Sequence, residues 1–282
     1  MVKIISDSTC DLSPEIIKEL DITLTPLYII SGDEQFRDGV DIQPVDVFRM
    51  VDKEKKSLST AAVNIFEYET VFEQYSASHD EVVHINISQG FSACYQNAII
   101  AAEEFPNVHV VDSRNLSTGS GYLVHDAAIM AKEGKTAKEI CDYLEEAKTR
   151  MNASFVIDRL DYLHKGGRCS LAKLIATRVL NIKPCIEVAD GKMRVGAKFK
   201  GKFDNCLDEY VKARLSNIDN IDLKRVYITH TTCTTETVER IRGALAEKGF
   251  KDIIETNAGC TVSNHCGPFT LGVLFMQKTP LV

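Results

Sequence analysis

Long apolar runs are missing from this sequence, and so is any run of Lys and Arg. The apolar stretches reach only the length of a strand, far short of a membrane span, and the first residues lack the architecture of a signal peptide. The net charge of −7 argues against a main partner that is nucleic acid or an anionic membrane surface. We therefore expect a soluble, cytoplasmic protein with no membrane span and no nucleic-acid partner.

Motifs for metal, disulfide or nucleotide chemistry are also missing. The nine cysteines form no C-x-x-C pair and the seven histidines no H-E-x-x-H, which argues against a zinc site or a disulfide framework. Gly119 and Gly121 supply only the first part of a G-x-G-x-x-G motif, so a nucleotide site is unsupported. We expect no metal and no cofactor. Most of the cysteines are expected to be small apolar core residues. The exceptions are three that fall in Gly- or Ser-rich turns, namely Cys10, Cys94 and Cys266.

With 282 residues, the chain is long enough for two cores. Residues 1–158 alternate apolar strands, polar turns and helices, which predicts a mostly parallel α/β/α lobe with its turns at one ligand-binding edge. Residues 159–282 contain an antiparallel hairpin around Asp190-Gly191 among further helices and strands, which predicts an α+β lobe with a mixed sheet. We expect a helix over residues 170–181, one strand over 22–30 and an irregular connection over 53–64.

The stretch SQGFSACYQNA, residues 88–98, runs from an apolar strand through a turn into a helix. Gly90 permits a tight turn, and the free N–H groups of a helix that begins near Ser92 make an electropositive site. Such a helix end favours a carboxylate or a phosphate. The stretch therefore predicts an anion-binding site centred on Ser92.

Two other segments have features that suit the same site. Asn64 and Glu67 resemble a capping box, so a helix N-terminus is expected to point at the loop that holds Ser59 and Thr60. His265 falls in a predicted loop of Gly, Ser, Asn and Cys, where a polar side chain can face a cleft. These residues are candidates for holding the anion.

Alternative interpretations of the same residues stay open at this point. GFSAC resembles the G-x-S-x-G nucleophile elbow without its last glycine, so Ser92, His265 and Asp112 are candidates for a hydrolase triad. Ser92 is also explained as a simple helix cap. Lys200, at the expected start of a helix, has the ordinary interpretation of a solvated side chain.

Taken together, the motifs resemble the DegV family of bacterial fatty-acid-binding proteins, the lipid-carrying subunits of the fatty acid kinase system. The resemblance runs the full length and rests on SDSTCDL, FRDGVDI, ISQGFSACYQNA, VDS at 111–113, LDYLHKGGR, LNIKP and NHCGPFTLG, in the family's order. It implies two α/β lobes with one extended acyl chain buried inside and its carboxylate near the lobe junction.

The resemblance also implies roles for individual residues. Ser92, Thr60 and His265 take the positions of the family's carboxylate-binding groups, and Lys200 stands where a family arginine commonly sits. The secondary site residues are Ser59, Lys200, Gly90, Phe91 and Ala93. Apolar residues that suit an acyl tunnel are Ile29, Phe91, Ile129, Phe155 and Leu163.

The leading hypothesis is a non-catalytic carrier that binds a long-chain fatty acid and presents its carboxyl group to a separate ATP-dependent fatty acid kinase, which forms the acyl phosphate. One alternative is a serine esterase that uses Ser92 and His265. Another is a member of the family that stores or senses lipid without kinase coupling.

Overall fold

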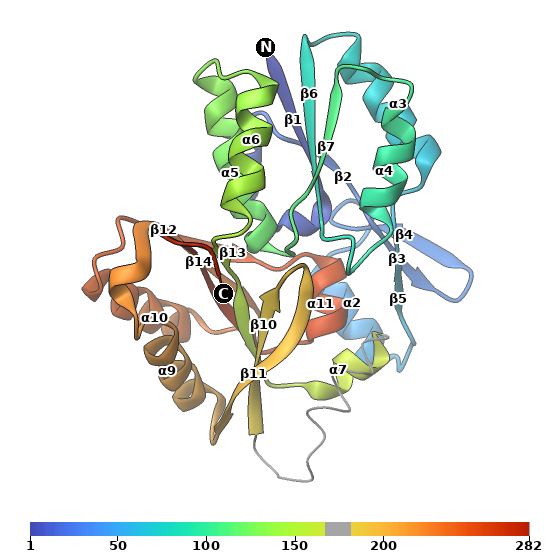
Figure 1. The fold of residues 1–282 in the computed structure, drawn as a ribbon. Helices are drawn as coiled ribbons and strands as arrows, with labels where there is room; N and C mark the ends of the chain where they lie inside the picture. The colour runs from blue at the N-terminus through green and yellow to red at the C-terminus, as the bar shows by residue number, and fades with distance from the viewer. Residues whose placement is uncertain (167–181, 282) are drawn as a thin grey trace.

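The computed structural model describes residues 1–166 and 182–281 (Figure 1). The helix expected over residues 170–181 lies outside these described residues. Within them, no helix is both long and apolar enough to cross a membrane.

A four-stranded parallel sheet with helices on both faces forms the N-terminal lobe (Figure 1). Its strands lie in the order β2-β1-β6-β7 and span Val2–Asp7 (β1), Thr23–Thr25 (β2), Glu81–Asn86 (β6) and Val108–Asp112 (β7). The helices of this lobe are Ser8–Cys10 (η1), Pro14–Glu19 (α1), Ile65–Ser76 (α3), Cys94–Ala102 (α4), Thr118–Lys132 (α5) and Ala137–Ala147 (α6). Helices α3 and α4 cover one face of the sheet, while α5 and α6 cover the other (Figure 1).

Local sequence explains where several of these helices begin. The Ser13 hydroxyl accepts from the backbone N–H of Ile16 and Pro14 is the first helical residue of α1, as expected. Asn64 and Glu67 form the predicted capping box at the start of α3, with each side chain accepting from the other residue's backbone N–H.

A small antiparallel sheet, β4-β3-β5, lies beside the parallel sheet. Its strands are Tyr28–Ser31 (β3), Glu34–Arg37 (β4) and Ser59–Ala61 (β5), and helices Pro44–Phe48 (α2) and Arg49–Lys53 (η2) connect β4 to β5. Two predictions were wrong here. The strand expected over 22–30 is interrupted after Thr25, and Ser59 and Thr60 lie in a strand rather than in an irregular connection.

A seven-stranded mixed sheet forms the C-terminal lobe, with β12 and β13 parallel and the other pairs antiparallel. The order is β11-β10-β9-β14-β12-β13, and β8 also pairs with β14. The strands span Met151–Asn152 (β8), Ser154–Ile157 (β9), Ile182–Ala189 (β10), Lys192–Lys200 (β11), Ile221–Thr231 (β12), Asp252–Asn257 (β13) and Thr270–Gln277 (β14). The helices are Leu160–Lys165 (α7), Phe203–Arg214 (α9), Ile218–Asn220 (η3), Thr235–Glu247 (α10) and Cys260–Cys266 (α11).

The hairpin predicted around Asp190-Gly191 is confirmed as β10–β11. The predicted α/β fold, with a parallel sheet in the N-terminal part and a mixed sheet in the C-terminal part, is also confirmed. Strands β8 and β9 already belong to the second sheet, although they precede the boundary placed at residue 158. The chain therefore enters the second sheet directly after α6.

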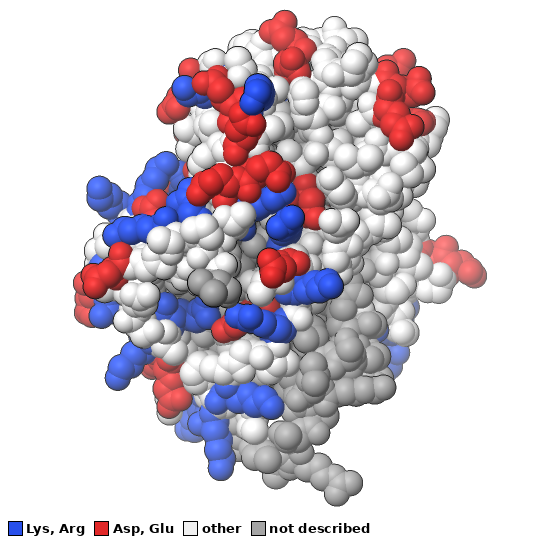
Figure 2. Space-filling view, viewed as in Figure 1, with Lys and Arg blue, Asp and Glu red and all other residues white. Residues whose placement is uncertain are grey.

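One hydrophobic cluster contains buried residues of both lobes. One face of the mixed sheet packs on α9 and α10, through side chains such as Tyr210 and Leu245. Residues of its other face, such as Phe155 and Leu274, join the core of the N-terminal lobe. On the surface shown in Figure 2, Lys and Arg gather over the C-terminal lobe, interspersed with Asp and Glu. Because buried residues of both lobes pack in one cluster, the junction of the lobes lies in the interior of the molecule.

Candidate ligand-binding site

A cavity of about 340 Å³ lies where the two lobes meet. Its volume falls within the range of about 300–1,000 Å³ that is usual for ligand pockets. The residues that line it come from both lobes and are Leu27, Ser59, Thr60, Ala61, Ala62, Ile87, Phe91, Ser92, Ala93, Leu116, Phe155, Leu163, Gly166, Met193, Thr261, Val262, His265 and Cys266.

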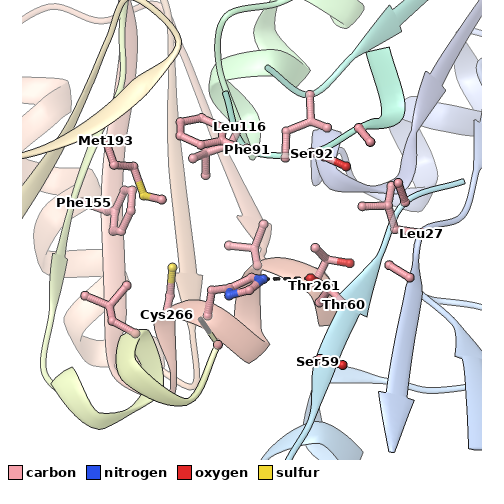
Figure 3. A pocket seen from close by; sticks show the side chains of 18 residues that line it. Leu27, Ser59, Thr60, Phe91, Ser92, Leu116, Phe155, Met193, Thr261 and Cys266 are labelled. Atoms are coloured by element: carbon pink, nitrogen blue, oxygen red, sulfur yellow. Dashed lines mark hydrogen bonds between the residues drawn. The ribbon is translucent and has the colours of Figure 1, made fainter. Parts of the chain in front are cut away.

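The lining of the cavity is mostly apolar, with a few hydroxyl groups and one imidazole among its side chains (Figure 3). Phe155 and Met193 lie on the side of the mixed sheet, with Phe91 and Leu116 close by, whereas Ser92 and Thr60 lie on the side of the N-terminal lobe. None of the described lining residues is Asp, Glu, Lys or Arg. The site thus suits a mostly apolar ligand that has one polar end.

Thr60 and His265 meet in this cavity, although 205 residues separate them in the chain. The Thr60 hydroxyl and the Nε2 atom of His265 share a hydrogen bond of 3.0 Å. Thr60 is held by β5, where it pairs with Ile29 of β3, and His265 is held by α11. A hydroxyl and an imidazole side by side are groups that can donate hydrogen bonds to a carboxylate.

Helix α11 carries His265, so the prediction that this residue lies in a loop was wrong. The helix forms there because two distant carboxylates accept from its first backbone N–H groups. Asp38 accepts from the N–H groups of Cys260 and Thr261, at 2.8 and 2.9 Å, and Asp11 accepts from that of Gly259 at 2.8 Å. These bonds hold a helix of the C-terminal lobe against the N-terminal lobe.

Burial raises the pKa of the Asp11 carboxyl to about 8. Hydrogen bonds from the Ser117 hydroxyl and the Gly259 N–H act in the opposite direction, and the neighbouring Asp38 adds to the rise. The pKa of Asp11 is therefore set in part by the same hydrogen bond from Gly259 that holds the start of α11.

The turn at Ser92 uses most of its backbone donors internally. The N–H groups of Phe91 and Ser92 both donate to the carbonyl of Ser88, at 2.9 and 3.3 Å, and the N–H of Cys94 donates to the Ser92 hydroxyl at 3.3 Å. The helix that was expected to begin near Ser92 is α4, and it begins two residues later, at Cys94. What Ser92 offers the cavity is its side chain.

The Ser92 hydroxyl donates to the sulfur of Cys94 at 3.1 Å. Cys94 is buried, and burial raises the pKa of its thiol to about 11, so it remains a thiol at neutral pH. This contact is weak compared with a bond to an oxygen acceptor. The Ser92 hydroxyl can therefore exchange the bond to Cys94 for a bond to an anionic ligand with little loss of free energy.

The residues proposed for a hydrolase triad have other partners. His265 bonds to Thr60 and Ser92 to Cys94, while Asp112 accepts from the backbone N–H of Arg114 at 2.8 Å. Asp112 also lies outside the cavity lining. The geometry thus gives no support to the triad.

Other predicted site residues are placed as follows. Ser59, Phe91 and Ala93 line the cavity, whereas Gly90 does not. Lys200 is exposed at the end of β11, paired with Ile182, and is not part of the lining. Of the apolar residues suggested for a tunnel, the lining contains Phe91, Phe155 and Leu163 but not Ile29 or Ile129.

Several lining residues were not predicted from the sequence. Leu27, Leu116 and Met193 have the apolar pattern of ordinary core residues, whereas the sequence distinguishes Cys266 only by its place in a predicted turn. Thr261 is 5% exposed, and its hydroxyl has no hydrogen-bond partner among residues 1–166 and 182–281. It lies four residues before His265 on α11, which places both side chains on one face of the helix.

A second, smaller cavity of about 20 Å³ adjoins the first. The two cavities share four wall residues, Leu116, Phe155, Val262 and Cys266. Elsewhere in residues 1–166 and 182–281, no group of three or more His, Cys, Asp and Glu side chains is arranged to hold a metal ion.

The fold and the cavity define an α/β protein of two sheets with an internal, mostly apolar ligand cavity between them. The chain belongs to the DegV family: the family model, described as "Uncharacterised protein, DegV family", matches residues 1–278. A DegV domain-containing protein of Caldanaerobacter subterraneus, TTE1491, is 34% identical over 98% of this chain and 99% of its own length. CPE0026 of Clostridium perfringens is 31% identical over 98% of this chain and 97% of its own.

Solved structures of the family have the same fold. A DegV family protein from Thermus thermophilus, described for its fatty acid binding, is 25% identical and gives a TM-score of 0.90 over 98% of this chain and 99% of that one. A stearic acid-binding protein from Eubacterium ventriosum is 28% identical and gives a TM-score of 0.86 over 99% of both chains.

Proposed function

We propose that this protein binds a long-chain fatty acid in the cavity, with the carboxylate near Thr60, His265 and Ser92. The observation that carries the proposal is the Thr60–His265 pair in a cavity whose described lining contains no Asp, Glu, Lys or Arg. Fatty-acid-binding relatives with the same fold support it.

The energetics suit such a ligand. Burial of an acyl chain of about 16 carbons, at about 0.8 kcal/mol per methylene, favours binding by on the order of 10 kcal/mol before the costs of association. A buried carboxylate is costly unless it accepts hydrogen bonds, and the hydroxyls of Thr60 and Ser92 with the imidazole of His265 meet that need. In this proposal the acyl chain supplies most of the affinity, while the polar groups set its orientation.

The protein is further proposed to be a non-catalytic carrier that presents the carboxyl group to a separate ATP-dependent fatty acid kinase in the cytoplasm. Two features of the sequence support this role. The DegV motifs resemble those of the lipid-carrying subunits of the fatty acid kinase system, and the sequence contains no G-x-x-x-x-G-K-[ST] motif for ATP.

Titration of delipidated protein with palmitate tests the binding proposal. We expect saturable binding of one fatty acid per chain, and weaker binding by Ser92→Ala. Absence of binding by the wild type would contradict the proposal. A separate assay with the cognate kinase and ATP tests presentation: formation of acyl phosphate supports a carrier, whereas binding without phosphorylation indicates lipid storage or sensing.

A further inference from the structure

The tip of the β10–β11 hairpin reaches the turn that carries Ser92. The hairpin belongs to the C-terminal lobe, and β11 is the edge strand of its sheet. β10 pairs with β9 over Cys185–Glu187, followed by one further bond from the N–H of Val188 to the carbonyl of Ala153. Past that point the hairpin extends toward the N-terminal lobe (Figure 1).

Ser88 makes the contact with this tip. It follows β6, is 1% exposed, and its hydroxyl donates to the carbonyl of Gly191 at 2.9 Å while accepting from the N–H of Gly90 at 3.1 Å. Its carbonyl accepts from Phe91 and Ser92, as described above. One residue therefore organises the turn and binds the hairpin.

The two glycines allow the backbones to touch. A Cβ atom on Gly90 would overlap the carbonyl oxygen of Gly191, which is backbone and cannot rotate away. Gly191 itself has φ of +71°, and a Cβ there would lie 2.5 Å from the Ser88 hydroxyl. Any larger side chain at Gly90 must push the tip off the turn.

Each partner in this contact carries a wall of the cavity. Phe91 and Ser92 belong to the turn and Ala93 directly follows it, while Met193 lies two residues after Gly191 on the hairpin. Figure 3 shows Met193 and Phe91 together along one side of the cavity. The distance between these walls thus depends on the contact between Ser88 and Gly191.

We propose that Ser88 is a positioning residue for the ligand site: its hydrogen bond to Gly191 fixes the hairpin wall against the Ser92 turn. This inference rests on the proposed function for the identity of the ligand, but the coupling of the two walls does not depend on it. Loss of the bond lets the walls separate, so a bound ligand escapes faster.

Ser88→Ala removes the bond to Gly191 together with the bond that the hydroxyl accepts from Gly90, and Ser6→Ala serves as its control. The buried Ser6 hydroxyl also donates to a backbone carbonyl at 2.9 Å, that of Ile85, inside the N-terminal sheet. In ligand-free protein, we expect amide hydrogen exchange to rise in peptides covering 88–93 and 188–193 for Ser88→Ala only, and the rise over 188–193 reports the loss of the hairpin contact. Equal exchange in both variants would overturn the proposal, whether or not the protein binds fatty acid.

The second readout is the rate at which bound palmitate is released, measured beside the melting temperature. We expect Ser88→Ala to release palmitate roughly threefold to tenfold faster than Ser6→Ala, the range that loss of the bond to Gly191 gives. Gly90→Ala should do the same, and the double variant should be no faster than Gly90→Ala alone, because both break one contact. Additive effects, or release rates that follow only the melting temperature, would overturn the proposal.

Discussion

Replacement of Thr60 by valine tests the polar end of the cavity. Valine has nearly the shape of threonine, so Thr60→Val removes the hydroxyl that lies 3.0 Å from the Nε2 atom of His265 and leaves the pairing of β5 with β3 in place. A hydrogen bond to a charged group contributes about 1.5–3 kcal/mol. If the hydroxyl donates to the ligand carboxylate, palmitate should bind roughly 10- to 150-fold more weakly.

Calorimetric titration with palmitate and with its methyl ester separates the carboxylate from the acyl chain. We expect Thr60→Val to weaken palmitate binding by this factor and methyl palmitate binding far less. Thr70→Val, an exposed position on α3 whose hydroxyl donates to the carbonyl of Phe66, controls for the substitution itself. Unchanged palmitate affinity, or an equal loss for acid and ester, would refute the reasoning.

Three further outcomes are expected. Burial lowers the pKa of His84 to about 3, and its ring packs against both Tyr68 and Phe72. As the pH falls below about 6.5, this histidine therefore takes up a proton in the unfolded state but not in the folded state. The free energy of unfolding should drop by about 2 kcal/mol from pH 7 to pH 5 in urea titrations, and this contribution should vanish in His84→Phe. Ala153→Val adds two methyl groups' worth of bulk at a wall of the second cavity and, if the acyl tail reaches this cavity, should weaken stearate more than laurate in competition titrations; equal losses for the two acids would contradict that placement of the tail. A fluorophosphonate probe should leave Ser92 unlabelled by peptide mass spectrometry, since the Ser92 hydroxyl donates to Cys94 and the imidazole of His265 is paired with the Thr60 hydroxyl; labelling would favour the esterase.

Local signals in the sequence were enough to predict much of the fold. The cap at Ser13, the capping box of Asn64 and Glu67, and the turn at Asp190-Gly191 each involve residues within a few positions of one another. Their geometry is set by the backbone and by short side chains, so the sequence alone determines it. The alternation of strands and helices indicated the parallel sheet for the same reason.

Elements that depend on distant partners could not be predicted in this way. Helix α11 has Gly259 as its N-cap, which offers no side chain, and its first N–H groups are satisfied by Asp38 and Asp11. Strand β5 is three residues long and is defined by its pairing with β3. No local pattern contains those partners, so His265 and Thr60 were both assigned to loops.

The lining of the cavity was the least predictable part of the site. Phe155, Leu163 and Phe91 line it, whereas Ile29, equally apolar, packs in another cluster of the core. An apolar residue that faces a cavity has the same sequence pattern as one that faces a neighbour. The Ser88–Gly191 contact was missed for a related reason, because it joins two lobes across 103 residues.

Mass spectrometry of an organic extract from the purified protein is the most direct test of the central claim. We expect about one long-chain fatty acid per chain, which is lost or reduced when Thr60→Val and Ser92→Ala are combined. A wild-type protein that carries no fatty acid, and that takes up none when palmitate is added, would contradict the account.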